Sequence, residues 1–149
     1  MGSGVAGIDR ESIAQMIAID TTVLIDEFRA KGNLEAPVNC ALLAHGNEEL
    51  IIPVIAAGEF LDGAAMISER RFQDALRLLQ TRKIVSVDFR AAEKYGRAVA
   101  DLRKQNSLSG RSQNDLWIAA ISLATGARLL TRNPDAFTKI TGLEVLGYV

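Results

Sequence analysis

The chain has 149 residues, of which 48% are hydrophobic and 23% are charged, and its formal net charge is −1 at pH 7. This length and composition predict one globular domain and exclude an intrinsically disordered protein. The charge excludes a generally basic nucleic-acid coat but not a local basic patch. The single cysteine, Cys40, cannot form an intramolecular disulfide, and no apolar run reaches transmembrane length. We therefore expect a cytoplasmic protein without membrane contact.

Residues 2–7 match G-x-G-x-x-G, the pattern of dinucleotide-binding proteins. No strand precedes this segment, and the residues after it do not begin a typical strand-to-helix unit, so we do not interpret it as a cofactor site. Residues 1–15 are instead predicted to be a flexible leader or an expression remnant. The folded domain is predicted to span residues 16–149.

Short apolar runs alternate with segments of helical periodicity along the rest of the chain. Strands are predicted over residues 16–19, 50–52, 83–87, 128–131 and 143–146. Helices are predicted over residues 21–32, 37–46, 54–64, 69–81, 89–104 and 112–124, with a short helical turn over 133–137. Strands that alternate with helices indicate an α/β fold with a parallel sheet covered on both faces.

Residues at the expected helix ends give more detailed predictions. Thr21 or Thr22 is predicted to cap the first helix, and Pro53 is predicted to occupy the first position of its helix. Asp88 is well placed to cap the helix that follows it, and Gly126 is expected to end another helix.

Asp20 follows directly after the apolar run at residues 16–19. It is therefore expected at the carboxyl end of a central strand, where open α/β sheets place their ligands. A carboxylate at the edge of a core needs a partner. Either Asp20 caps the following helix, or it binds a metal ion.

Two further acidic residues stand in apolar sequence. Glu59 lies in a segment suited to burial, and the preceding Gly58, which costs a helix about 1 kcal/mol relative to Ala, suggests close approach of another backbone or a ligand. The alternative is a residue at the solvent edge, and Asp62 shares much of the same face. Asp115 begins a helix that is apolar nearly all round, so it is expected at the edge of the sheet. Alternatively, Ser112 and Asp115 form a capping box without further chemistry.

The strand over residues 128–131 ends in a polar turn that contains Asn133 and Asp135. Asn-Pro is also an ordinary turn initiator. If the three carboxylates and this turn converge, like charges raise each other's pKa until a cation binds. Oxygen ligands select Mg²⁺ or Mn²⁺, and such ions bind substrate phosphates. The predicted chemistry is metal-dependent hydrolysis of a phosphodiester.

Other chemistries lack the residues that they need. A nucleophile activated by histidine must use His45, the only histidine, which stands at a predicted helix end where its charge favours the helix dipole. Cys40 and His45 are the only softer ligands for zinc. No phosphate-binding loop is present, and Thr22 stands where an aspartyl-phosphate phosphatase needs a second Asp.

Four segments resemble PIN domains, in the order that the family has them, and the similarity is greatest to the VapC-type toxins of toxin–antitoxin pairs. They are IAIDTTVLID at residues 17–26, the embedded Glu59, NDLWIAA at residues 114–120 and LTRN at residues 130–133. The resemblance spans residues 16–149. It implies a three-layer α/β/α sandwich with a central parallel sheet of about five strands. It also implies an Mg²⁺- or Mn²⁺-dependent endoribonuclease, homodimerisation and inhibition by a VapB-type antitoxin.

The resemblance assigns roles to particular residues. The acidic positions of the family fall on Asp20, Glu59 and Asp115, which are implied to be the catalytic metal ligands. The fourth acidic position is commonly Asp and is Asn133 here, with Asp135 as an alternative ligand, and this departure bears on a second metal ion more than on the first. The residues expected to support the ligands are Thr22, Asn114 and Thr131. Apart from the resemblance, a substrate phosphate near an acidic site needs cations, and the candidates are Arg111 and Arg132, followed by Arg29, Lys31, Arg70 and Arg71.

Three functions remain open from the sequence. As a toxin, the protein would cleave tRNA or another cellular RNA, and apolar residues after Thr22 and around Phe60 would offer a groove for an antitoxin helix. A PIN nuclease could instead act in RNA processing or on DNA, outside a toxin–antitoxin pair. A non-catalytic PIN scaffold would act only through protein interfaces, and Asn133 keeps that alternative open.

Overall fold

The structure is a computed structural model, and it describes residues 15–148. Apart from Gln15, the predicted leader over residues 1–15 lies outside the described residues. The proposed boundaries of the folded domain therefore stay a prediction.

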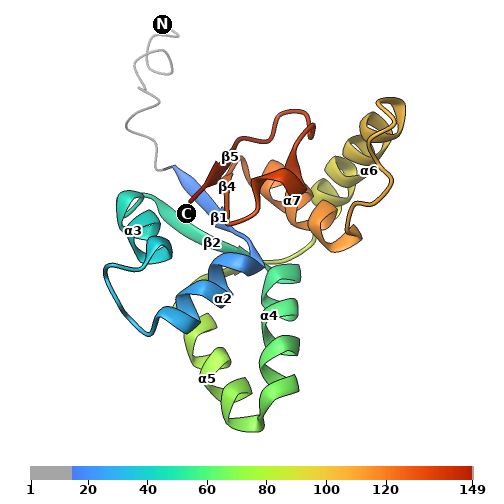
Figure 1. Ribbon diagram of the computed structural model, residues 1–149. Coiled ribbons are helices and arrows are strands. Elements are labelled where there is room, and N and C mark those ends of the chain that lie inside the picture. The colour runs from blue at the N-terminus through green and yellow to red at the C-terminus, as the bar shows by residue number, and fades with distance from the viewer. Residues whose placement is uncertain (1–14, 149) are drawn as a thin grey trace, which may run out of the picture.

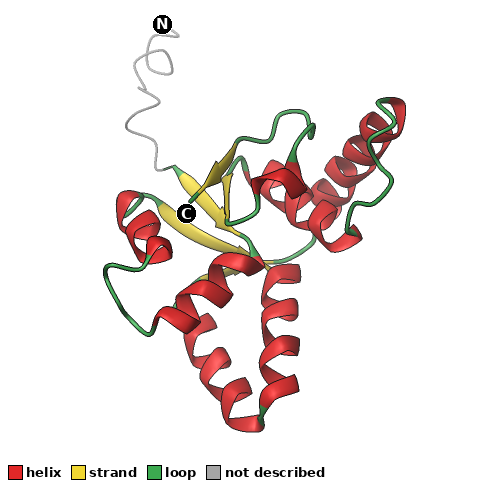
Figure 2. Ribbon diagram, in the orientation of Figure 1, coloured by secondary structure: helices red, strands yellow, loops and turns green. Residues whose placement is uncertain are grey.

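Five parallel strands form one sheet in the order β3-β2-β1-β4-β5, which confirms the predicted parallel sheet (Figure 2). Their bounds are β1 (Met16–Ile19), β2 (Glu49–Pro53), β3 (Lys83–Val85), β4 (Arg128–Thr131) and β5 (Val145–Gly147).

Three strands differ from their predicted bounds, and β2 is longer than the predicted 50–52 by one residue at each end. β3 was expected to reach residue 87 but ends at Val85, because its partner β2 ends at Pro53, which pairs with Val85. β5 was expected over residues 143–146 but begins at Val145, because the N–H of Leu143 donates to the carbonyl oxygen of Ile140 in a turn. Gly147 in β5 meets Pro134, since a Cβ atom at Gly147 would lie 2.8 Å from a ring carbon of that proline.

The central strand β1 is buried on both faces. Ile17, Ala18 and Ile19 have no exposed surface, and neither do Ile51 and Ile52 of the neighbouring strand β2. Consecutive buried residues in a strand require cover on both sides of the sheet, because successive side chains point to opposite faces. The three-layer arrangement inferred from the resemblance is therefore confirmed.

Helices provide this cover. Figure 1 shows α3 on one side of the strands, α6 and α7 on the other, and α4 and α5 as a hairpin that projects away from the sheet. Their bounds are α2 (Thr21–Ala30), α3 (Pro37–Ala44), α4 (Val54–Ile67), α5 (Glu69–Leu79), α6 (Phe89–Lys104), α7 (Gln113–Thr125) and the 3₁₀ helix η2 (Pro134–Phe137). Within residues 15–148, none of the helices combines the length and the apolar composition needed to cross a membrane.

The helix ends confirm two of the predictions and correct two. Asp88 caps α6 by accepting a hydrogen bond from a backbone N–H, and Gly126 ends α7 in the left-handed region at φ 75°. The cap of α2 is Asp20 rather than Thr21 or Thr22, because Asp20 is the last residue with extended backbone. Pro53 is the residue before α4 and the last residue of β2, not the first helical residue.

Candidate metal centre

Asp20 lies at the carboxyl edge of the sheet, as predicted. Its N–H donates to the carbonyl oxygen of Leu130 at 3.0 Å, which continues the pairing of β1 with β4 by one residue. The residue is only 4% exposed, although it begins the first turn of a helix. The end of a central strand and the start of α2 therefore hold one carboxylate at a fixed place.

Both oxygens of the Asp20 carboxylate accept hydrogen bonds. Oδ1 accepts from the N–H of Thr21 at 2.7 Å. Oδ2 accepts from the hydroxyl of Thr22 at 3.0 Å and from that of Thr131 at 2.8 Å. Thr22 and Thr131, which we expected to support the ligands, thus bind Asp20 from two different elements.

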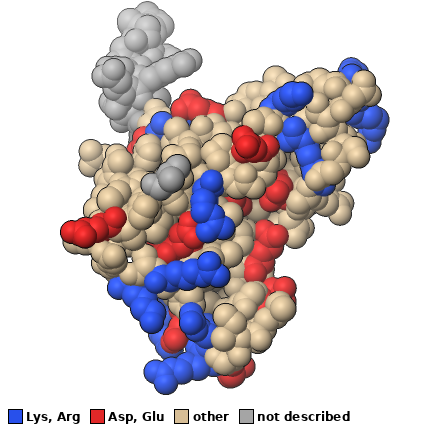
Figure 3. Space-filling view, in the orientation of Figure 1, with Lys and Arg blue, Asp and Glu red and all other residues tan. Residues whose placement is uncertain are grey.

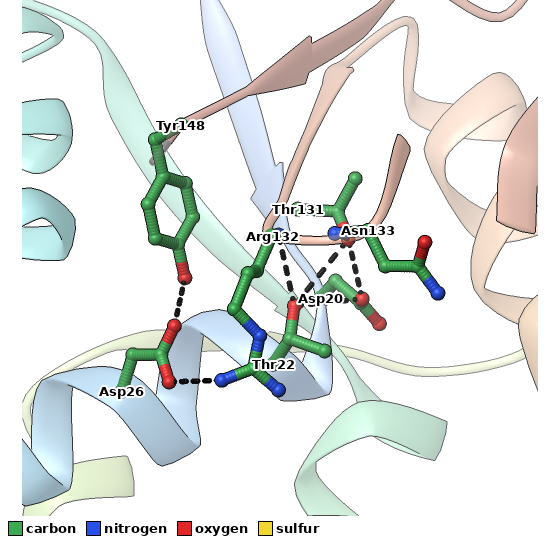
Figure 4. Close-up of polar contacts among 7 residues, drawn as sticks. All are labelled: Asp20, Thr22, Asp26, Thr131, Arg132, Asn133 and Tyr148. Atoms are coloured by element: carbon green, nitrogen blue, oxygen red, sulfur yellow. Dashed lines mark hydrogen bonds and ion pairs between the residues drawn. The ribbon is translucent and has the colours of Figure 1, made fainter. Parts of the chain in front are cut away.

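The two threonine hydroxyls are themselves held by the turn after β4 (Figure 4). The N–H of Arg132 donates to Oγ1 of Thr22 at 3.1 Å, and the N–H of Asn133 donates to Oγ1 of Thr131 at 3.0 Å. Because each hydroxyl accepts from the backbone and gives its own proton to Asp20, the carboxylate cannot turn without breaking this network.

Glu59 lies between the first turns of two other helices. Its Oε1 accepts from the hydroxyl of Thr21 at 2.6 Å, and its Oε2 accepts from the side-chain amide of Asn114 at 3.2 Å. The expected close approach of another backbone at Gly58 is wrong, because Gly58 is exposed and a Cβ atom built on it would meet no atom of residues 15–148 within 4 Å. Glu59 is therefore placed by its polar partners rather than by a close backbone contact.

Asp115 brings the third carboxylate into the same place. Its N–H donates to the hydroxyl of Ser112 at 3.3 Å, so the predicted cap of α7 is present. The side chain is half-buried, and this burial, with the charges of Asp20 and Glu59, raises the pKa of Asp115 to about 6. The three acidic residues thus converge closely enough to repel one another.

The donor set fits a hard divalent cation, but the ligands do not yet form a complete cage. Within residues 15–148, no three His, Cys, Asp or Glu side chains are already grouped to hold a metal ion. The available donors are oxygens. Burial, and to a smaller extent the charges of Asp20 and Glu59, raises the pKa of Asp115, and a bound cation would stabilise its carboxylate. Each oxygen of Glu59 accepts one hydrogen bond, from Thr21 or from Asn114, which leaves a lone pair on each oxygen for a metal ion.

The fourth position lies on the rim of the centre. Asn133 and Asp135 are both exposed, and they line a polar hollow of about 580 Å³ together with Asp115, Arg111 and Lys139. Asn133 contacts the network around Asp20 through its backbone N–H. Asn133 and Asp135 therefore both lie near Asp115, on the wall of the same hollow.

The two arginines expected to bind substrate have different surroundings. Arg111 donates to the carbonyl oxygens of Ser107 at 2.7 Å and Ala136 at 3.3 Å, so it joins the loop before α7 to η2. Arg132 forms an ion pair with Asp26 and is 48% exposed (Figure 4).

Asp26 also accepts a hydrogen bond from the hydroxyl of Tyr148 at 2.7 Å, and burial together with this bond raises the pKa of Tyr148 well above its usual value. The sequence did not single out Asp26 and Tyr148, because they are 122 residues apart and each is unremarkable in its own segment. Thr21 was considered only as a helix cap, and its position next to Asp20 was the available signal for its contact with Glu59.

Basic and acidic side chains lie next to each other on this face of the molecule. Figure 3 shows Lys and Arg gathered over α2 and α5, with acidic side chains between this group and α7. The net charge of the chain is near zero, so its composition could not predict a local basic patch. The structure has such a patch over α2 and α5 (Figure 3).

His45 lies away from this centre. It ends α3, and its Nδ1 lies 2.9 Å from a carboxylate oxygen of Glu48, just before β2 begins. This is the amino end of a parallel strand, whereas the three carboxylates lie at the carboxyl ends. The histidine is therefore not part of the candidate centre.

Comparison with known proteins assigns the family. Residues 17–143 match the sequence pattern of the PIN domain. The chain belongs to the PIN domain family. It is 30% identical over 139 residues to ribonuclease VapC11 of Mycobacterium tuberculosis, an alignment that covers 89% of this chain and 99% of that protein. It is 27% identical to ribonuclease VapC1 of Haemophilus influenzae strain R2866, over 85% of this chain and 92% of that one.

Solved structures of the same family share the fold. VapBC2 from Rickettsia felis, bound to a DNA fragment from its promoter, aligns over 91% of this chain and 100% of the matched chain, with a TM-score of 0.75 and 22% identity. VapBC-1 from nontypeable Haemophilus influenzae aligns over 89% and 98%, with a TM-score of 0.74 and 23% identity. This PIN-domain chain is thus homologous to the VapC ribonuclease toxins of toxin–antitoxin systems, which confirms the resemblance seen in the sequence.

Proposed function

We propose that this PIN-domain protein is a metal-dependent endoribonuclease and the toxin of a type II toxin–antitoxin system. The observation that carries the proposal is the convergence of Asp20, Glu59 and Asp115 at the carboxyl edge of the sheet. Its similarity to VapC ribonucleases over most of both chains supports the same conclusion.

Asp20, Glu59 and Asp115 are the proposed catalytic ligands of Mg²⁺ or Mn²⁺, with Asn133 or Asp135 at the fourth position. A bound divalent ion would lower the pKa of the attacking water and stabilise the leaving oxygen of the phosphodiester. Asp20 has the most constrained role, since its direction is set before any ligand arrives. Asp115 is the adaptable member of the set, because it is only half-buried.

The proposed partner is a VapB-type antitoxin, which would lie in an apolar groove beside the centre. Phe28 of α2 and Phe60 of α4 pack edge to face with ring centroids 5.4 Å apart, and Ile67, which is 67% exposed, continues the groove along α4. Glu59 lines the same groove, so a helix bound there would reach the metal centre. VapBC complexes are among the structural neighbours, which supports an antitoxin partner. Homodimerisation and a cytoplasmic location are proposed from the resemblance to VapC-type toxins alone.

Cleavage of RNA is the direct test of this function. Purified protein is incubated with a pool of tRNA and synthetic RNA in Mg²⁺, in Mn²⁺ and in EDTA, and the cut sites are mapped. Asp20→Asn and Asp115→Asn should each reduce cleavage about a hundredfold or more, because each replaces a charged oxygen ligand with a neutral amide. Asp62→Asn is the matched control, since Asp62 is an exposed acid on the same helix as Glu59, and it should cleave like the wild type.

Two results would contradict the proposal. Cleavage that persists in EDTA, or that is as strong in Asp20→Asn as in the wild type, would come from a contaminant. If the protein cleaves no RNA and binds Mn²⁺ no more tightly than its Asp20→Asn variant does, it is a non-catalytic PIN scaffold. The amide at Asn133 keeps that alternative open.

A further inference from the structure

A second groove lies beside Arg132, and Arg29 lines both this groove and the apolar groove at Phe60. It runs between α2, the start of α3 and the end of β5, and its cavity volume is about 550 Å³. Its walls are apolar where Ala36, Pro37 and Val38 line it, and Tyr148 lies on the other side. Figure 4 shows the Tyr148 ring between α3 and the Arg132 side chain.

One carboxylate fixes the polar side of this groove. Asp26 accepts from the hydroxyl of Tyr148 with one oxygen and pairs with Arg132 through the other. Both oxygens of Asp26 are thus engaged, and its charge is matched by Arg132. Arg29 also lines the groove, so the charge left for a ligand is positive.

The groove is also connected to the proposed metal centre. The N–H of Arg132 donates to Thr22, which donates to Asp20, while the Arg132 side chain lines the groove. Asp26 follows Asp20 by six residues on α2, which is roughly 9 Å along the helix at 1.5 Å per residue. A single strand with one phosphate at the centre can therefore reach the groove with a neighbouring nucleotide.

We propose that this groove binds the base of one unpaired nucleotide of the RNA substrate, next to the bond that is cut, with its phosphate on Arg29 and Arg132. The proposal rests on the ribonuclease function proposed above. An aromatic ring facing an apolar wall suits the flat face of a base, and single-stranded RNA is recognised by such stacking. Phosphate supplies the negative charge that the two guanidinium groups attract.

Binding of two single-stranded probes tests the assignment without cleavage. One probe is a fluorescein-labelled RNA of twelve nucleotides and mixed sequence, and the other has the same ribose-phosphate backbone without bases. Fluorescence anisotropy is measured in EDTA with the full chain. Tyr148→Leu should weaken binding of the RNA about tenfold and leave binding of the abasic backbone unchanged, whereas Arg29→Met should weaken both.

Three further variants control this experiment. Tyr148→Phe keeps the ring and should bind the RNA nearly as the wild type does. Phe89→Leu removes an aromatic ring that is 84% exposed at the start of α6, after the opposite edge strand, and should change neither probe. Ala36→Tyr fills the groove from its other wall and should reproduce the loss seen with Tyr148→Leu, which keeps the test open if that variant fails to fold.

Each outcome decides a separate question. Unchanged RNA binding by both Tyr148→Leu and Ala36→Tyr overturns the groove assignment. Equal loss on both probes makes the groove a site for phosphate alone and overturns the base assignment. If the protein binds the RNA through its bases but cleaves no RNA, the groove assignment stands and the nuclease function is contradicted. If the protein cleaves RNA but binds both probes alike, the nuclease function stands and the groove assignment is contradicted.

Discussion

Asp20 and Asp115 lie at the same edge of the sheet, but their surroundings differ. Asp20 is 4% exposed and accepts three hydrogen bonds, from Thr21, Thr22 and Thr131. Asp115 is half-buried, and within residues 15–148 no side chain or backbone group donates a hydrogen bond to its carboxylate. Asp20 is therefore stabilised in the free protein, whereas Asp115 is held in an unfavourable, charged neighbourhood.

This difference indicates that the two carboxylates have different roles in the proposed centre. A carboxylate that is bound from two sides defines a position, because moving it breaks several hydrogen bonds at once. A carboxylate that only repels its neighbours costs stability until a cation neutralises it. Energy that destabilises the free site would then favour the bound one.

The largest expected change in stability comes from removing a hydrogen-bond partner of Asp20. Thr131→Val leaves the N–H of Asn133 without its acceptor and removes one donor from the buried carboxylate. The free energy of unfolding should fall by about 2 kcal/mol, measured by urea unfolding. Thr131→Ser keeps the hydroxyl and should lose less, and Thr138→Val, at an exposed threonine, should lose almost nothing. A loss no larger in Thr131→Val than in Thr138→Val would remove the contrast between the two carboxylates.

Replacing the other carboxylate should have the opposite sign. Asp115→Asn removes one of three repelling charges, so in EDTA at pH 7.5 the free energy of unfolding should rise by about 1 kcal/mol, after allowing for screening of a half-exposed group. Asp62→Asn, on a neighbouring helix, should be neutral. If Asp115→Asn is less stable than the wild type in EDTA, Asp115 contributes contacts that outweigh repulsion.

The pH dependence sharpens this prediction. An unfolded Asp loses its proton near pH 3.8, whereas Asp115 in the folded protein keeps its proton to about pH 6. The folded state therefore binds more protons between these values, so its stability falls as the pH rises from 4 to 6. The difference between Asp115→Asn and wild type should grow across this range and level off above it. A constant difference from pH 4 to pH 7.5 would show that the carboxyl group does not titrate there.

An effect no larger than that of Asp115→Asn, but of opposite sign, is expected outside the carboxylate cluster. Tyr148→Phe removes the hydrogen bond to Asp26 but keeps the ring, and Arg132 continues to pair with Asp26. The thermal midpoint should fall by only a few degrees, corresponding to about 1 kcal/mol. If the loss is as large as that of Thr131→Val, the hydrogen bond at Asp26 stabilises the fold as much as the one at Asp20, which contradicts the prediction.

The sequence predicted the buried part of this contrast better than the exposed part. An apolar run that ends on Asp20 fixes a strand, its end and a polar group at the sheet edge, because burial and periodicity act on neighbouring residues. The strand order β3-β2-β1-β4-β5 was not predicted, because periodicity does not determine which strands pair. Helix capping and metal binding by Asp20 were alternatives in the sequence analysis. In the structure, Asp20 caps α2 and also lies at the candidate centre, so the two roles are compatible.

Side-chain contacts across the fold were beyond the sequence. The bond from Thr21 to Glu59 and the Asp26–Arg132–Tyr148 group join residues from distant segments, and no local pattern marks them. The exposed positions Asn133 and Asp135 stayed undecided for a related reason, since within residues 15–148 neither packing nor a hydrogen bond restricts their side chains in the way that it restricts Asp20.

The central claim is that Asp20, Glu59 and Asp115 together bind a divalent cation. Isothermal titration of the protein with Mn²⁺ at pH 7.5 tests it most directly, with Asp115→Asn and Asp62→Asn measured beside the wild type. The wild type and Asp62→Asn should bind alike, and Asp115→Asn should bind at least tenfold more weakly. At pH 5, where Asp115 is mostly protonated, the affinity of the wild type should fall toward that of Asp115→Asn. Equal affinity of all three proteins at pH 7.5 would contradict the claim.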